Sequence, residues 1–420
     1  DTRIPIADAL PVVEEILGWM QCTPGVHQLE VAGSVRRFRD TVGDVDILGT
    51  ADRPGQAVAH FVELDLVREV IAQGDTKATI LTDTGIQVDL RIVPPPQFGS
   101  LLQYFTGSRE HNIALREHAR GLGLSLSEYG ITEIASGQAT SYEDENAFYA
   151  RLGMQFIPPE MRENRGEIQL ALKGRLPVVL EQGDIRGDLH VHTVWSDGQA
   201  SVYEMARAAR ERGYEYIAVT DHSVGLGVVS GMDADKLEKQ RVEIEETMRR
   251  LPGLRILRGV EVNIRADGSL DLPDEVLAGL DIVIAGVHGA MNQSADRMTA
   301  RLVRVLENPH VDVLAHPSGR LLGKRDPVQM DVSAVFRAAR DNGKMLEMNA
   351  MIDRLDLTDR AAAAARDMGI PIAIGTDAHA LHHLDYMQYG VRLARRAWCE
   401  KAHIVNTLPA PALLERLGRV

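Results

Sequence analysis

The second half of the chain alternates short apolar runs with longer segments of amphipathic spacing. The runs are short enough for buried strands, and apolar residues between them recur at the period of a helix that faces a core. Strands and helices that alternate in this way predict a parallel sheet closed into a barrel. The seven predicted strands centre on Leu189, Ile217, Leu257, Val283, Val313, Met345 and Ile372, and the predicted helices run from Val202 to Glu211, Asp235 to Arg250, Met298 to Leu306, Val332 to Asp341 and Asp359 to Met368.

Most of these apolar runs stop on a residue that can bind a metal ion. Because a parallel barrel gathers the C-terminal ends of its strands at one face, we expect these side chains to meet. In the first run, His190 and His192 share one strand face and Asp197 follows in a turn. A lone His-x-His is more often structural, and the recurrence along the chain favours a metal site instead. The other run-end residues are His222, Glu261, His288, His316, Asp377 and His379.

From Asp184 to the C-terminus, this arrangement resembles the polymerase and histidinol phosphatase superfamily, or PHP domain. The resemblance implies a distorted barrel of seven strands and a cluster of three metal ions with nine ligands. Histidine and carboxylate ligands suit Zn²⁺ or Mn²⁺, and the residues alone do not choose between these ions. The ligands that the resemblance implies are His190, His192, Asp197, His222, Glu261, His288, His316, Asp377 and His379.

In the first half of the chain, two predicted strands present three carboxylates. Asp44 and Asp46 share a strand face, and Asp89 lies on the polar face of a strictly alternating strand at 86–93. If the strands are neighbours, the repulsion between these carboxylates requires cations, so we interpret them as ligands for two Mg²⁺ or Mn²⁺ ions. An Asp-x-Asp alone is more often solvent-exposed, but the preceding Gly33 and Ser34 and the isolated Asp89 favour a metal site.

From Arg3 to about Ile157, the chain resembles the palm and thumb of family X DNA polymerases, both in these residues and in the segment 104–116. The resemblance implies that Asp44 and Asp46 bridge both metals and that Asp89 holds the catalytic one. For Tyr104 and Phe105, plain core packing is the alternative to a role at the nucleotide sugar. The resemblance further assigns Gly33, Ser34 and Arg37 to the nucleotide triphosphate, Tyr104, Phe105 and Gly107 to its sugar, and Asn112 and Arg116 to the DNA minor groove.

The predicted fold is therefore multidomain, with α/β and α+β parts. A nucleotidyltransferase-like palm at 1–93 and a thumb at 94–160 precede a charged connector at 161–184 and a distorted (β/α)7 PHP barrel at 185–420. A shift in composition after Pro158 and Pro159 marks the boundary. The lyase domain and helix-hairpin-helix elements that precede the palm in family X are expected to be absent, which would weaken the grip on duplex DNA.

Length, composition and net charge limit the number of domains, the classes of binding partner and the cellular compartment that we expect. A length of 420 residues suggests two or three domains, and no apolar run reaches the length of a membrane span. The net charge of −14 argues against a nucleic-acid partner, but carboxylates that bind cations contribute to that sum. Cys22 and Cys399 lie outside every motif, which favours a reducing cytoplasm over a disulfide framework. We expect a monomer.

The predicted function is DNA repair by a family X polymerase with a metal-dependent 3′-5′ exonuclease. Its partners would be deoxynucleoside triphosphates and gapped or primer–template DNA with free 3′ ends. Arg320, Lys324 and Arg325 follow His316 and could hold DNA phosphates, although a solvated loop explains them equally well. The alternatives are a 3′-phosphatase or abasic-site endonuclease at the same cluster, a metal-stabilised scaffold for the polymerase, and an unrelated nucleotidyltransferase fused to a phosphatase.

Overall fold

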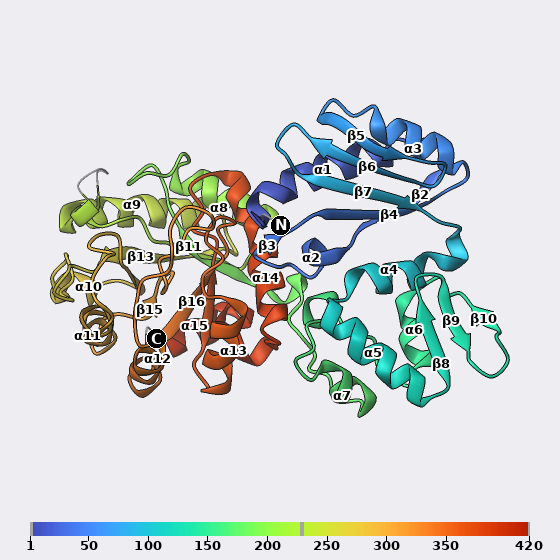
Figure 1. Cartoon of the computed structure of the whole chain (residues 1–420). Coiled ribbons are helices and arrows are strands. Elements are labelled where there is room, and N and C mark those ends of the chain that lie inside the picture. Colours follow the sequence, from blue (N-terminus) through green and yellow to red (C-terminus); the bar gives the residue numbers. More distant parts are fainter. Residues whose placement is uncertain (1–2, 227–230, 419–420) are drawn as a thin grey trace. The chain divides into compact units, whose positions relative to one another are not determined.

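The computed structural model describes residues 3–226 and 231–418, which form two compact units (Figure 1). The first unit is Asp1–Pro177 and the second is Val178–Val420. The boundary between them lies inside the segment 161–184, which the sequence assigns to a connector. Across the described residues, every helix is too short or too polar to cross a membrane.

A five-stranded sheet with helices on both faces opens the first unit. Its central strands β4 and β7 are parallel, and the other pairings are antiparallel. Ile47 and Val88 are fully buried beneath α1 and α3, whereas Leu48 packs under α4 on the opposite face. The sheet order is β2 (Val26–Val31), β4 (Val45–Ala51), β7 (Gln87–Ile92), β6 (Lys77–Thr82) and β5 (Val67–Gln73), with β1 (Ile4–Pro5) and β3 (Thr41–Val42) paired apart from it and helices α1 (Ile6–Gln21), α2 (Gly33–Arg36) and α3 (Pro54–Val62).

The remainder of the first unit packs helices on a small antiparallel sheet, and buried ion pairs hold it to the palm. Arg162 is fully buried, and it donates to Glu145 Oε1 at 2.6 Å and to the Ile157 carbonyl at 2.9 Å. Glu145 also accepts from Arg36 of α2, at 2.8 and 3.1 Å. The elements are α4 (Phe98–Thr106), α5 (Arg109–Gly121), β8 (Leu124–Ser127), β9 (Gly130–Glu133), β10 (Ala139–Thr140), α6 (Glu145–Arg151) and α7 (Glu167–Leu172).

Part of the expected connector belongs to this packing. Glu167 is fully buried, and its Oε1 lies 2.7 Å from His111 Nδ1, whose ring also contacts the Tyr149 hydroxyl at 3.1 Å. Together with Arg162, this pair makes residues 161–172 an integral part of the first unit rather than a free segment. Two of the charges in the expected connector, Arg162 and Glu167, are buried and paired.

In the second unit, seven parallel strands follow one another around a barrel in chain order, as the sequence predicts. The predicted helices at 202–211 and 332–341 agree with the structure at both ends. The strands are β11 (Gly187–Val191), β12 (Tyr216–Val219), β13 (Arg255–Asn263), β14 (Ile282–Gly286), β15 (Val313–Leu314), β16 (Met345–Asn349) and β17 (Ile372–Gly375). The helices are α8 (Val202–Glu211), α9 (Ala234–Arg250), α10 (Asp274–Leu277), α11 (Ala295–Leu306), α12 (Val332–Asp341), α13 (Asp359–Asp367), α14 (Met387–Arg396) and α15 (Ala410–Arg416).

Side-chain caps explain where several of these helices begin. Ser201 accepts from the Glu204 amide, and the Glu204 carboxylate accepts from the Ser201 amide, which forms a capping box before α8. Asp331 and Thr358 cap α12 and α13 by accepting from the amides three residues later. These caps satisfy amides that would otherwise lack a partner in the first helical turn.

The first and last strands of the barrel meet through three kinds of contact. At the C-terminal ends, the His192 amide donates to the Ala378 carbonyl at 2.8 Å. At the other end, the Asn406 side chain donates to the carbonyls of Gly187 and Ile374 and accepts from the Ile374 amide. Leu413 of α15 joins the apolar core beneath the strands. The C-terminal segment therefore takes the place of a further strand pairing.

We predict that Glu145→Gln destabilises the thumb by about 3–5 kcal/mol, because it leaves the buried Arg162 and the largely buried Arg36 without their carboxylate. Burial would raise the pKa of Glu145, but Arg162 and Arg36 outweigh it and lower the pKa below 4.5. The contribution is therefore present above the unfolded-state pKa and is lost as the pH falls through the folded-state value. Denaturant unfolding followed by hydrogen exchange of peptides from 98–163 measures the effect.

The exposed Glu143→Gln is the matched control for this variant. Equal unfolding midpoints for the two variants at pH 7 would show that the buried ion pairs do not stabilise the thumb.

Candidate metal centres

All nine predicted ligands lie at the C-terminal ends of the barrel strands. His190 stands in β11 and Glu261 in β13, and each of the other ligands follows the end of a strand. Three groups among them have ligand atoms within 4.8 Å of one another. The groups are His190, His192, Glu261 and Asp377; His192, Asp197, His222 and His379; and His222, Glu261 and His288.

Glu261 lies at the centre of the cluster. Its Oε1 is 2.9 Å from His288 Nε2 and 2.8 Å from His316 Nε2. Its Oε2 is 3.0 Å from His222 Nδ1 and 3.3 Å from His190 Nε2. Both oxygens of this carboxylate therefore have imidazole nitrogens close to them, and the carboxylate could provide ligand atoms to more than one metal ion.

The donor set fits metal ions better than it fits a network of hydrogen bonds. Within the described part of the chain, Nδ1 of His192 and of His316 is buried without a hydrogen-bond partner, and Glu261 Oε2 and His222 Nδ1 lie 3.0 Å apart without the geometry of a hydrogen bond. Unsatisfied buried polar atoms are costly, and a metal ion would satisfy them. Nitrogen and oxygen donors in this proportion suit Zn²⁺ and Mn²⁺.

Electrostatics in the cluster also call for positive charge. Burial alone would raise the pKa of Glu261, but His288, His222 and His190 outweigh it and hold the pKa well below its ordinary value. Burial would raise the pKa of Asp377 as well, yet His190 and His192 hold it well below its ordinary value. Either protons or divalent cations bound to the histidine nitrogens would supply the positive charge that stabilises these two carboxylates.

Two buried carboxylates outside the predicted ligand set lie around the cluster, and one of them, Glu347, contacts the ligands directly. Glu347 of β16 is 2% exposed, with Oε1 2.6 Å from His190 Nδ1 and Oε2 accepting from the His316 amide. Asp221 accepts from the Thr193 amide and hydroxyl, from Ser196 and from Gln240. Glu347 ends an apolar run, so the rule that found the ligands could have found it too. Such outer contacts fix the imidazole tautomer and orientation.

Two ligands have a backbone conformation that side chains rarely adopt. Asp377 has φ 56° and His316 has φ 27°. Left-handed backbone at a residue other than glycine is unfavourable and is found mostly where function demands it. The positions of these two side chains therefore depend on the surrounding packing.

The structure corrects the prediction that Arg320 binds DNA. Its side chain is buried, and it donates to the carbonyls of Arg354 at 2.9 Å and Leu355 at 2.5 Å. Arg320 therefore supports the loop after β16 from within and does not face a DNA strand. Lys324 is exposed in the same region.

In the palm, the central strands bring the three predicted carboxylates together. Asp46 and Asp89 are directly paired in the register of β4 and β7, and Asp44 immediately precedes β4. Burial, and then the charges of Asp44 and Asp89, raise the pKa of Asp46 to about 7. Like charges this close favour a shared proton or divalent cations, which fits a site for Mg²⁺ or Mn²⁺.

Gly33 and Ser34 lie at the start of α2, beside these carboxylates. Gly33 has φ 60°, and a Cβ atom at this position would lie 3.0 Å from Asp46 Oδ2. A glycine is therefore needed both for the turn and for the close approach to Asp46. Arg37 follows the helix, but its guanidinium binds Glu163 at 3.0 Å and the Thr106 carbonyl at 2.8 Å.

The predicted sugar-flanking residues form one turn at the end of α4. Tyr104 and Phe105 meet edge to face at 5.3 Å, and Arg91 lies 4.6 Å from the Phe105 ring centroid. Asn112 donates to the Tyr104 carbonyl at 2.8 Å and accepts from Gln103 at 3.1 Å. Asn112 therefore holds the turn in this structure, and one N–H of its amide has no part in these two bonds.

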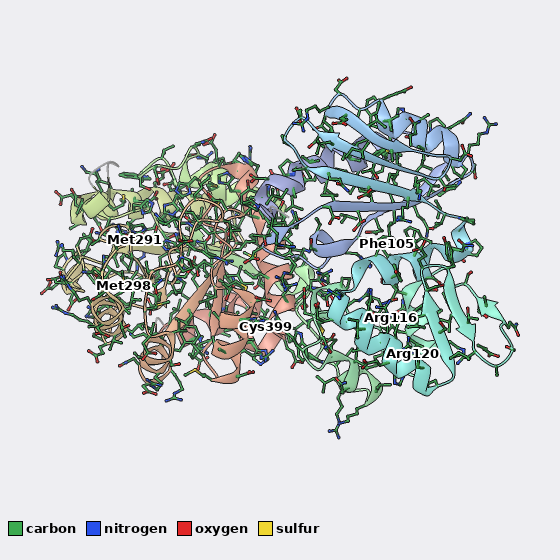
Figure 2. The ribbon with its side chains drawn as sticks, viewed as in Figure 1. Phe105, Arg116, Arg120, Met291, Met298 and Cys399 are labelled. Carbon is green, nitrogen blue, oxygen red and sulfur yellow. The ribbon has the colours of Figure 1, made fainter. Side chains whose placement is uncertain are left out.

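Arg116 and Arg120 lie one helical turn apart on α5 (Figure 2). Arg116 is partly exposed and Arg120 is exposed. Neither guanidinium has an ion-pair partner among the residues that the structure describes. They present two positive charges from one side of the helix, and the sequence analysis named only Arg116.

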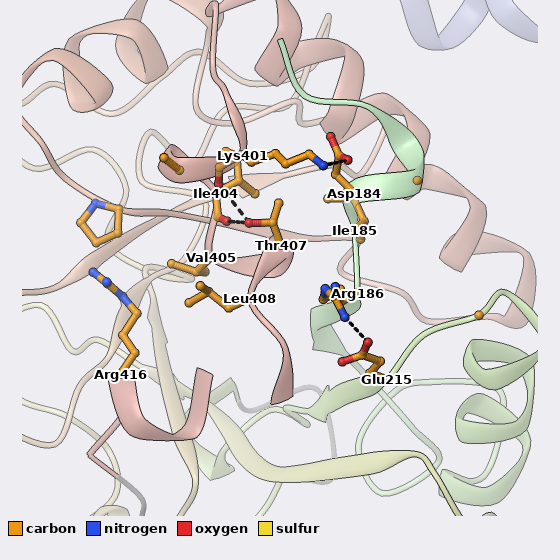
Figure 3. Close-up of a pocket in the computed structure, with 14 residues that line it drawn as sticks. Asp184, Ile185, Arg186, Glu215, Lys401, Ile404, Val405, Thr407, Leu408 and Arg416 are labelled. Atoms are coloured by element: carbon orange, nitrogen blue, oxygen red, sulfur yellow. Dashed lines mark hydrogen bonds and ion pairs between the residues drawn. The ribbon is translucent and has the colours of Figure 1, made fainter. Parts of the chain in front are cut away.

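A cavity of about 700 Å³ lies at the opposite end of the barrel from the ligand cluster (Figure 3). Its lining includes Arg186, immediately before β11, and Pro371, immediately before β17. Lys401 pairs with Asp184 at 2.6 Å, and Arg186 pairs with Glu215. The cavity is thus separate from the cluster, and most of its charged side chains already have partners.

Comparison with known proteins agrees with this geometry. A model of the DNA polymerase beta thumb matches residues 101–163, and a PHP domain model matches residues 188–351. The chain is 31% identical over 233 residues to a protein named "Probable phosphatase" from Thermoanaerobacter sp. (strain X514), covering 52% of the chain and 89% of that protein. It is 35% identical over 201 residues to a protein of the same description from Acetivibrio thermocellus, covering 46% and 78%.

One relative matches both units. DNA polymerase/3′-5′ exonuclease PolX of Bacillus subtilis (strain 168) is 40% identical over 406 residues, which cover 96% of this chain and 71% of that protein. The match spans the palm carboxylates, the thumb and the barrel cluster. The chain therefore belongs to the PolX-type DNA polymerase/3′-5′ exonucleases, the family X DNA polymerases that carry a PHP domain.

Proposed function

We propose that the chain adds deoxynucleotides to DNA 3′ ends in the palm and removes them in the barrel, with a separate metal site for each reaction. The assembly of all nine predicted ligands at one end of the barrel supports the exonuclease assignment most directly. The register that pairs Asp46 with Asp89 supports the polymerase assignment.

In the palm, Asp44, Asp46 and Asp89 would hold two Mg²⁺ or Mn²⁺ ions. When bound, these ions would activate the primer 3′-hydroxyl and neutralise the triphosphate. Gly33 leaves the backbone beside Asp46 open, and Ser34 adds a hydroxyl donor for a phosphate oxygen. On nucleotide binding, Arg37 would leave its ion pair with Glu163 and bind the triphosphate instead. Glu163 would retain its contact with Arg39, whose Nη1 lies 3.5 Å from it.

In the barrel, the nine ligands would hold up to three Zn²⁺ or Mn²⁺ ions. When bound, these ions would supply activation of water and neutralisation of the phosphodiester charge. Glu347 holds His190 in the tautomer that leaves Nε2 free to bind. Asp377 and Glu261 supply the buried negative charge that retains divalent cations.

The partners of this reaction pair are DNA with free 3′ ends and deoxynucleoside triphosphates, and we propose that the protein acts as a monomer. Arg116 would contact the DNA backbone or minor groove from α5, with Arg120 beside it. Tyr104, Phe105 and Gly107 would flank the nucleotide sugar at the end of α4.

A second candidate activity is a phosphatase at the same barrel cluster. It is favoured by the relatives named "Probable phosphatase", which match the barrel alone. Oligonucleotides that end in a 3′-hydroxyl, a 3′-phosphate or an abasic site distinguish the two candidates. Release of mononucleotides supports the exonuclease, and release of phosphate alone supports the phosphatase.

We predict that Asp89→Ala abolishes nucleotide addition and leaves 3′-5′ degradation unchanged. The change removes one of the three converging palm carboxylates, and Asp89 belongs to the first unit, whereas the barrel ligands belong to the second. Primer extension and 3′-end degradation are measured on the same labelled DNA. Asp83→Ala, at an exposed position before β7, is the control. Near-normal extension by Asp89→Ala would be incompatible with the palm assignment.

For the barrel, we expect the double variant His190→Ala/His192→Ala to bind fewer metal ions. Its degradation of labelled single-stranded DNA in Mn²⁺ should fall by about three orders of magnitude or more, because water is not activated without the metal. Plasma mass spectrometry gives the metal content, and circular dichroism monitors folding. His310→Ala lies outside the cluster and serves as the control. Full metal content together with full activity in the double variant would refute the cluster assignment.

A further inference from the structure

The guanidinium of Arg354 lies beside the metal cluster and has no role in the metal binding and DNA binding proposed so far. Arg354 follows β16, and its Nε lies 3.4 Å from Asp377 Oδ2. Its side chain is 19% exposed, so it is largely buried and still reached by solvent. Within the described residues, the guanidinium donates no hydrogen bond. The Nε group therefore faces a carboxylate of the cluster without the geometry of a hydrogen bond.

The backbone that carries Arg354 is held rigidly by the neighbouring loop after β15. Arg320 donates to the Arg354 carbonyl at 2.9 Å, and the Leu322 amide donates to the Asp353 carbonyl at 2.6 Å. Asp356 accepts from the amides of Ser318 and Gly319 at 3.0 and 2.9 Å. The two loops are thus joined at several points, and the position of Arg354 is set before any ligand binds.

A second arginine lies near the same place. Arg325 donates through Nε to the Gly319 carbonyl at 2.8 Å, on the loop that clamps Arg354. Burial, and then the positive charge of Arg354, lower the pKa of Arg325. Arg325 therefore adds a second positive charge near Arg354, which favours the binding of an anion beside Arg354. The anion that the cluster itself attracts is a phosphate group.

We infer that Arg354 binds a non-bridging oxygen of the phosphate held at the barrel cluster, and that Arg320 positions it from behind. The inference rests on the proposed exonuclease function and adds a substrate contact to it. The planar guanidinium can donate two parallel hydrogen bonds to a phosphate, which an ammonium group cannot do in the same geometry. Arg354 would therefore contribute both to substrate binding and to the stabilisation of charge during cleavage.

The test compares Arg354→Ala and Arg354→Lys with the wild type and with Arg337→Ala, an exposed arginine on α12. We expect both Arg354 variants to keep their metal content. Their kcat/KM for 3′-5′ degradation should fall by about tenfold to a hundredfold, as for loss of a charged hydrogen bond. Binding of deoxyadenosine monophosphate, measured by calorimetry with Mn²⁺ present, should weaken by a similar factor. Added guanidinium ions should partly restore Arg354→Ala and leave Arg337→Ala unchanged.

Other outcomes overturn the inference. Normal binding of deoxyadenosine monophosphate and normal kcat/KM in both variants would show that Arg354 does not contact phosphate. Loss of metal ions from Arg354→Ala and Arg354→Lys would show that the residue serves metal retention instead. If the wild type failed to degrade DNA, the proposed function would fail, and the calorimetric comparison would still decide whether Arg354 binds a phosphate.

Discussion

Neutralisation of crowded, buried charge is the constraint on which both candidate sites depend. In the barrel, one fully enclosed carboxylate, Glu261, has five imidazole groups around it. In the palm, Asp46 faces the charges of Asp44 and Asp89 at partial burial. Neither arrangement is favourable for an apolar interior, where isolated charges are very costly. Divalent cations would neutralise the charge at both sites.

The two units meet this constraint by different geometries. The palm needs only two neighbouring strands, because the register of β4 and β7 places Asp46 opposite Asp89. The barrel draws on strands that are far apart in sequence, and every ligand is delivered at or just beyond a strand end. This difference explains why the strand-end rule located the barrel ligands from sequence, whereas the palm required the assumption that two strands are neighbours.

The roles of polar side chains that can donate several hydrogen bonds were harder to predict from the sequence. Arg320 and Asn112 both occur in plausible positions for DNA binding, yet both donate to nearby backbone carbonyls. Local pattern cannot tell a side chain that holds a loop from one that holds a ligand, because both are polar and both follow a structured element. Glu347 shows the converse, since it was predicted as part of a strand and turns out to orient His190. The charged run at 161–172 likewise looks exposed in sequence, although Arg162 and Glu167 are buried in tertiary contacts.

Closure of the barrel links the metal cluster to the order in which the chain is synthesised. The backbone contact between His192 and Ala378 brings the first ligands together with Asp377 and His379, and Asn406 fills the gap at the other end. On the ribosome, the N-terminal unit can fold first, because the strands of its sheets all come from Asp1–Pro177. The barrel must wait for nearly the whole C-terminal segment to emerge. The palm carboxylates can therefore come together on a nascent chain that is not yet able to assemble its barrel cluster.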